Sequence, residues 1–161
     1  MAEFAAEDRG GPEDDTMIGS EIRAYAAGWA DPGVFAGYVR WLCGQAREDA
    51  PRPDGYVPCT TLWWVSGGEY LGRLAIRHRL TPRLREHGGH IGYDVRPSAR
   101  RRGHATAMLA AGLAVAATLC IGPALVMCDE DNLGSRKVIE ANGGVLAGKH
   151  SGRLHFWVPA S

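Results

Sequence analysis

The longest apolar stretch of the chain runs from residue 105 to residue 128, and it restricts the fold more than any other feature. Arginines precede it and acids follow it, as in a membrane span with a positive inner flank. However, Gly122-Pro123 interrupts the stretch near its end, and much of it is alanine and glycine. We therefore expect a buried helix over 105–120, a tight turn and a buried strand over 124–128, with no membrane partner.

The composition suits one domain with an ordinary hydrophobic core. Of the 161 residues 45% are apolar, so a second domain is not needed to explain the chain. The formal net charge is zero, so no field of the whole molecule attracts nucleic acid or anionic lipid. Residues 1–16 should be a disordered acidic tail without a secretory signal. Residues 17–161 should form a single cytoplasmic domain.

The cysteines and histidines do not indicate a metal centre. The four cysteines lack C-x-x-C spacing, and a chain of this size does not depend on disulfides. We interpret them as reduced thiols, with Cys128 packed in the core rather than reactive. His87 and His90 have H-x-x-H spacing, but a junction between a loop and a strand would not hold both rings on one ion. No metal is expected.

The rest of the sequence alternates between helical and extended patterns. Apolar residues at helical spacing indicate helices, and β-branched or aromatic runs between turn residues indicate strands. The expected helices cover residues 20–29, 34–47 and 133–141, with a short helix or a plain loop at 81–89. The expected strands cover residues 60–65, 70–76, 90–95, 145–149 and 154–158. This order predicts an α/β or α+β domain with a mixed sheet.

The segment between the strand at 90–95 and the long helix indicates an anion site. Gly103 permits a close approach that a side chain would prevent, and Ala105 keeps the helix entrance clear. The first amides of a helix have no partner within it, and the helix dipole adds partial positive charge there. The three arginines at 100–102 add forked donors that fit phosphate oxygens. A phosphate should therefore bind at this helix start.

Other phosphate-binding motifs do not match this segment. It lacks the lysine of a P-loop and the three glycines of a dinucleotide fingerprint. A nucleic-acid site would use the same arginines, but stacking aromatic residues are not interleaved with them. As a further alternative, the arginines form only a solvated surface. We expect no nucleic-acid partner.

Two motifs in this sequence resemble the GNAT acyltransferase superfamily. Residues 100–105 resemble its R/Q-x-x-G-x-G/A pyrophosphate loop, which follows a V-x-P strand end, here residues 95–97. Residues 132–135, followed by 140–144, are similar to the family's Asn-x-x-Ser helix and its terminal glycine. Each motif is loose alone, but the two at family spacing are specific. The resemblance covers about residues 60–160.

The resemblance implies a mostly antiparallel central sheet flanked by helices, with a V-shaped gap between the strands that end near Val95 and Cys128. Acetyl-CoA or another acyl-CoA would lie in this gap. Main-chain groups of Tyr93 and Val95 would pair with its pantetheine amides, and the Val95 N–H would polarise the thioester carbonyl. Asn132 would reach the pantetheine, or it would simply cap its helix. The pyrophosphate would be held at Arg100, Arg101, Arg102, Gly103, His104, Ala105 and Thr106.

The activity implied by the resemblance is N-acylation by direct attack of a neutral amine on the thioester. No covalent enzyme intermediate is involved. The acceptor would be a primary amine of a small molecule, with a protein amine as an alternative. A module that binds acyl-CoA without turnover is the rival class. A homodimer is also possible.

Two positions depart from the family pattern. Many relatives carry a tyrosine on the last helix as the acid that protonates the thiolate, and the matching residue here is Ile139. Others use a glutamate near the start of the strand before the loop, and the matching residue here is Gly89. The acid and the base must therefore come from other residues.

Four other residues are candidates for proton transfer. Ser135 could donate to the departing sulfur, and Tyr93 could act through a water. His90 could titrate near neutrality, although strand alternation would point it away from the face of Tyr93 and Val95. It could equally be a half-exposed strand residue. Asp129 follows the strand that forms the other wall, so it could bind or deprotonate the amine, or it could be only solvated.

Overall fold

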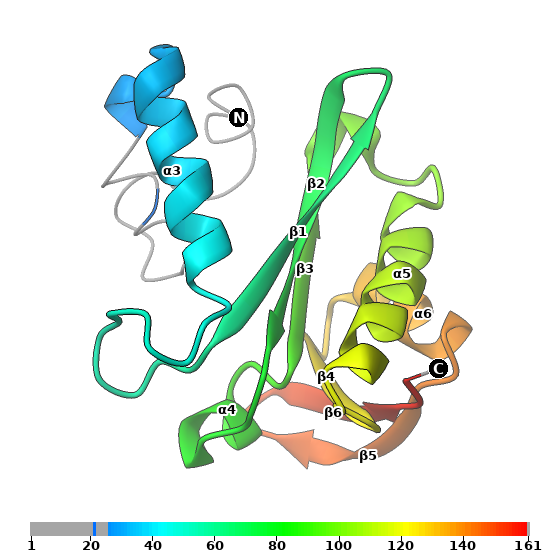
Figure 1. Cartoon of the computed structure of the whole chain (residues 1–161). Helices are drawn as coiled ribbons and strands as arrows, with labels where there is room; N and C mark the ends of the chain where they lie inside the picture. The colour runs from blue at the N-terminus through cyan, green and yellow to red at the C-terminus, as the bar shows by residue number, and fades with distance from the viewer. Residues whose placement is uncertain (1–20, 22–25, 161) are drawn as a thin grey trace.

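A sheet of six strands forms the centre of the structure, a computed structural model that describes residue 21 and residues 26–160 (Figure 1). The expected acidic tail lies outside the described residues, as does half of the expected helix at 20–29. The described part of that helix contains a short 3-10 helix, η1 (Ala26–Gly28).

The sheet is mixed but mostly antiparallel, as predicted. Its strand order is β1-β2-β3-β4-β6-β5, and β3 and β4 are the only parallel neighbours. The strands are β1 (Cys59–Ser66), β2 (Glu69–Arg77), β3 (Ile91–Val95), β4 (Ala124–Asp129), β5 (Val145–His150) and β6 (Arg153–Val158).

Helices cover both faces of the sheet. Figure 1 shows α5 and α6 on one side of the sheet and α3 on the other. The short segment at 81–89 contains a helix rather than a plain loop, because Thr81 accepts a hydrogen bond from Leu84 N at 3.2 Å and caps it. The helices are α3 (Pro32–Gly44), α4 (Pro82–Glu86), α5 (His104–Thr118) and α6 (Leu133–Ala141), with a 3-10 helix η2 (Pro97–Ala99).

The boundary expected at the start of α3 was wrong. The helix was expected to begin at residue 34, but Asp31 caps α3 and the helix begins at Pro32. Asp31 Oδ1 accepts hydrogen bonds from Gly33 N at 2.7 Å and Val34 N at 3.0 Å. Pro32 fits the first helical position because its fixed φ is helical and its missing N–H would have had no partner there. The helix consequently begins two residues earlier than expected.

A buried ion pair joins the N-terminal part of the chain to the sheet. Arg73 on β2 donates from Nη1 to Glu21 Oε2 at 2.6 Å and from Nη2 to Oε1 at 3.2 Å. Tyr38 of α3 donates its hydroxyl to the same carboxylate at 2.7 Å. All three side chains are buried. Since removing one partner would leave an uncompensated buried charge, this contact fixes α3 on its face of the sheet.

The apolar stretch at 105–128 forms a helix and a strand of the core, as expected. α5 lies so close to β2 that a Cβ built on Gly112 would be 2.6 Å from Leu74 Cδ1. The small residues of the stretch therefore serve close packing, which explains its alanine and glycine content. Within the described part of the chain, no helix combines the length and apolar character needed to cross a membrane.

The parallel strands β3 and β4 are joined at one end and separate toward the other. Their ladder pairs Ile91 with Val126. Just before this pair, His90 N donates to Leu125 O at 2.7 Å, and Leu125 N donates to His90 Nδ1 at 2.9 Å. The imidazole thus takes the place of a main-chain acceptor. Beyond the pair, the strands run on without ladder pairing, so a gap opens between their ends.

We predict that His90 makes the stability of the fold dependent on pH. Burial, together with the nearby cations Arg85 and Arg77, lowers the pKa of His90 in the folded protein. The unfolded chain therefore binds more protons, and the free energy of unfolding should fall as the pH drops below about 6.5. Thermal unfolding between about pH 7.5 and pH 5.5 measures this loss.

The test compares His90→Asn with His87→Gln. An asparagine at position 90 offers an amide oxygen to Leu125 N without titrating in this range, so its curve should be flatter than that of the natural protein. Burial also lowers the pKa values of His78 and His155, so only part of the slope should disappear. His87→Gln removes an exposed histidine and is the control variant. Equal slopes for all three proteins would contradict the prediction.

Candidate active site

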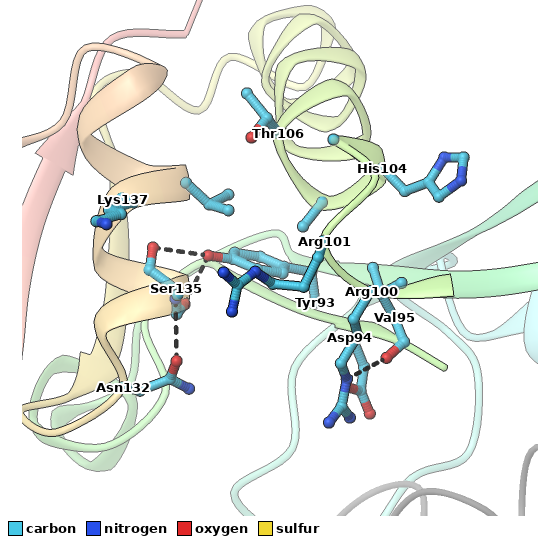
Figure 2. Close-up of a pocket in the computed structure, with 14 residues that line it drawn as sticks. Tyr93, Asp94, Val95, Arg100, Arg101, His104, Thr106, Asn132, Ser135 and Lys137 are labelled. Carbon is cyan, nitrogen blue, oxygen red and sulfur yellow. Dashed lines mark hydrogen bonds between the residues drawn. The ribbon is translucent and has the colours of Figure 1, made fainter. Parts of the chain in front are cut away.

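A pocket of about 460 Å³ lies at the open end of the gap between β3 and β4 (Figure 2). Its walls come from the end of β3, the loop before α5, the first turn of α5 and the first turns of α6. This volume is in the range of a site for a small organic ligand. The lining residues are Tyr93, Asp94, Val95, Arg100, Arg101, Gly103, His104, Ala105, Thr106, Asn132, Gly134, Ser135, Lys137 and Val138.

The first turn of α5 has the uncapped amides that the expected anion site requires. Gly103 is its N-cap residue with a φ of +81°, which a side chain would make unfavourable. No side chain caps the helix. The first amides of α5 therefore remain available to an anion, and the helix dipole favours negative charge there.

The edge of β3 presents main-chain groups to the same pocket. Arg96 N donates to Leu71 O on β2 at 3.0 Å. Because successive residues of a strand direct their N–H groups to alternate edges, those of Tyr93 and Val95 point toward β4. Ladder pairing between β3 and β4 is confined to Ile91 and Val126, so these N–H groups face the gap. An extended ligand that contains amides could pair with them.

Two hydroxyl groups meet inside the pocket. Tyr93 Oη lies 2.6 Å from Ser135 Oγ and donates to Ser135 O at 3.2 Å. Figure 2 shows the two side chains reaching toward each other from β3 and α6. Burial raises the pKa of Tyr93 to about 12, although the hydrogen bond to Ser135 opposes this. Both hydroxyls therefore keep their protons at neutral pH.

Residues 15–145 match a family model described as the acetyltransferase (GNAT) domain. The chain belongs to the GNAT acetyltransferase family. The match includes β3, the loop before α5 and the start of α6, so the pocket lies within the GNAT domain. The resemblance based on residues 100–105 and 132–135 is therefore confirmed. GNAT enzymes generally use an acyl-CoA as acyl donor, which agrees with an anion site beside an open strand edge.

The fold is similar to that of an acetyltransferase from Agrobacterium tumefaciens strain C58, which is known from a crystal structure. The TM-score is 0.55, and the two sequences are 20% identical. The similarity covers 96% of this chain and 80% of the other chain. At this identity the likeness supports the GNAT fold alone. No curated protein matches the sequence.

Most residues expected to bind the donor line this one pocket. Arg102 is the exception among them, because its exposed side chain lies outside the lining. Arg100 lines the pocket, but its Nε donates to Val95 O at 2.9 Å and so ties the loop to the strand end. Asn132 caps α6, with Oδ1 accepting from Ser135 N at 2.9 Å. Its contact with pantetheine stays a prediction.

The structure separates the four candidates for proton transfer. Tyr93 and Ser135 lie together in the pocket. His90 does not line it, because its ring accepts a hydrogen bond from Leu125 N of β4 at the end where the two strands are joined. Asp129 is exposed outside the pocket, and its Oδ1 lies 3.2 Å from Arg153 Nε. The geometry therefore favours the hydroxyl pair.

Packing explains both departures from the family pattern. Gly89 has a φ of +65°, and a Cβ there would collide with the main-chain oxygen of Leu125. A glutamate cannot replace it without displacing β4. Ile139 is fully buried in the core, beneath the turn at Gly144. A tyrosine at that position would overfill the core.

The lining also includes residues that the sequence did not indicate. Three of them lie on the first turns of α6, where their spacing from Asn132 could have revealed them once the helix was placed. The fourth is Asp94, a buried carboxylate on the strand between two expected residues. Cys128 is buried and its thiol pKa is raised by burial, so it is not an activated nucleophile. The residues not indicated are Asp94, Gly134, Lys137 and Val138.

We predict that Gly103→Asp abolishes CoA binding, measured by calorimetry. No heavy atom lies within 4 Å of a Cβ built on Gly103, so a side chain has room there, although the φ of +81° strains it. Its negative charge would nevertheless enter the anion site. Gly103→Asn is the matched control, because asparagine has the same size without the charge and tolerates a left-handed backbone. If the two variants bind CoA equally, the phosphate lies elsewhere.

Proposed function

We propose that the protein transfers the acetyl group of acetyl-CoA to a primary amine of a small molecule. One observation carries the proposal: the start of α5, the open edge of β3 and the hydroxyl pair of Tyr93 and Ser135 all line a single pocket. These are the partners that a ligand with a pyrophosphate, an amide-containing arm and a thioester requires. The acetyl group is consumed, so acetyl-CoA is a substrate.

The proposed mechanism is direct attack of the amine on the thioester. The N–H of Val95 faces the gap and would polarise the thioester carbonyl. The start of α5 would hold the pyrophosphate, and the edge of β3 would hold the arm. Together these contacts fix the thioester relative to the incoming amine, which itself accelerates the reaction. A covalent intermediate on Cys128 is not needed.

Incubation with acetyl-CoA and a panel of amines, followed by mass spectrometry of the products, tests this function. The panel should include amino acids, polyamines, aminoglycosides and a lysine-containing peptide. Acetylation of a small amine well above the rate in buffer would support the proposal. Acetylation of the peptide alone would favour a protein amine. CoA binding without transfer to any amine would favour a module that binds acyl-CoA without turnover.

Loss of either hydroxyl should slow acetyl transfer without preventing it. We expect Tyr93→Phe and Ser135→Ala each to lower kcat by about 10-fold to 1,000-fold, because each removes part of the proton-transfer network. CoA binding should stay close to that of the natural protein. Tyr56→Phe is a matched control, since Tyr56 is exposed and outside the pocket.

Complete loss of transfer in one variant, with normal binding of both substrates, would contradict the prediction. It would identify a single essential catalyst rather than a shared role. The pH profile adds a second readout. Because the pKa of Tyr93 is about 12, deprotonation of this hydroxyl should cause no decline in rate below about pH 10.

A further inference from the structure

Arg101 has an unusual backbone conformation for an arginine. Its φ of 64° lies in the left-handed region, where a side chain is strained. Glycine would occupy the same position without strain. Such strain clusters at functional sites, and it therefore indicates a role for the Arg101 side chain.

The side chain of Arg101 points into the pocket. Figure 2 shows it extending from the loop before α5 in the direction of Tyr93 and Ser135, whereas Arg100 turns away to Val95 O. Within the described part of the chain, no carboxylate pairs with Arg101, in contrast to Arg96 and Arg136. A guanidinium is thus directed into the gap where an acyl donor would lie.

A cation at this place would stabilise the thiolate that leaves when the C–S bond of the thioester breaks. At the position where many GNAT enzymes carry the acid that protonates the thiolate, this chain has Ile139, which is buried in the core. The hydroxyl of Tyr93 is a weak replacement, because its pKa is about 12, whereas a thiol has a pKa of about 8.5. Proton transfer from this tyrosine to a thiolate is therefore unfavourable. Stabilising the thiolate as an anion avoids this barrier.

We propose that the guanidinium of Arg101 stabilises the sulfur of CoA as it leaves. This role rests on the proposed function. The amine nitrogen forms a bond to the acyl carbon, the C–S bond breaks, and its electron pair stays on sulfur. The amine releases its proton to the solvent. The thiolate, held by Arg101, later takes up a proton from the solvent through the Tyr93 and Ser135 hydroxyls.

Phosphate binding is the competing role for Arg101. The start of α5 already provides amides for a phosphate, and Arg102 lies on the exposed side of the same loop. The two roles differ in a measurable way. A phosphate contact affects any CoA analogue equally, whereas a thiolate contact lowers the pKa of the bound thiol and needs the sulfur atom.

Calorimetry in buffers of different ionisation enthalpy measures the protons released when CoA binds, and desulfo-CoA provides the reference without sulfur. A cation close to a thiolate lowers the thiol pKa by about one unit or more. At a pH equal to the pKa of the thiol of free CoA, a decrease of one unit in that pKa on binding releases about 0.4 of a proton. We expect this release with CoA but not with desulfo-CoA.

Arg101→Gly is the deciding variant, because glycine relieves the strained backbone and the variant should fold at least as well. It should still bind CoA, but the proton release should fall to the desulfo-CoA level, and kcat should drop by about 10-fold to 100-fold. Arg101→Lys should retain part of the release. Arg102→Gln removes the same charge one residue away and should keep the full release, even if affinity falls.

Three results would overturn the role of Arg101. The first is CoA binding by the natural protein without extra proton release. The second is equal proton release by Arg101→Gly and the natural protein. The third is loss of both CoA and desulfo-CoA binding by Arg101→Gly. The last result would assign Arg101 to the phosphates. Failure of the natural protein to bind CoA at all is a different outcome, which would overturn the proposed function itself.

Discussion

The separation of two parallel strands is the constraint on which the rest of the structure depends. β3 and β4 are held together at one end by the pair Ile91–Val126 and by the bonds between His90 and Leu125. Beyond this point each strand packs against a different helix, since α5 contacts β3 and α6 contacts β4. The gap is thus kept open by core packing on both sides, and it leaves one edge of β3 available to a ligand.

The same constraint determines where catalytic groups can lie. The main-chain oxygen of Leu125 leaves no space for a side chain at Gly89, and the packing of α6 places Ile139 in the core. Many GNAT relatives carry their acid and their base at these two positions, but in this chain both positions serve packing and carry no titratable group. The polar groups that reach the gap instead come from the end of β3, the strained loop and the first turn of α6. Chemistry distributed over such groups depends more on position than on one strong acid or base.

Much of the fold could be predicted from the sequence, because the relevant signals are local. The apolar stretch, the glycines of the hairpins and the breaks at prolines each determine the conformation of a few neighbouring residues. The boundaries of the strands and helices were therefore predicted to within a few positions. The boundary at Pro32 was missed because proline both ends helices and begins them, and only the cap formed by Asp31 shows which applies. The ion pair between Glu21 and Arg73 joins residues far apart in the chain and has no local signal.

The sequence by itself determined the family, and it predicted an anion site at the start of the long helix, because the glycine and the uncapped amides that indicate the site are neighbours in the chain. Only the tertiary structure decided which side chains face the gap. His90 and Tyr93 are both plausible proton carriers in the sequence, yet one is bonded to β4 and the other meets Ser135. The side chain of Arg101 likewise extends into the pocket, from a loop residue with a left-handed backbone. The packing of one strand or helix against another sets these orientations. Such packing exists only once segments that are distant in the sequence come together.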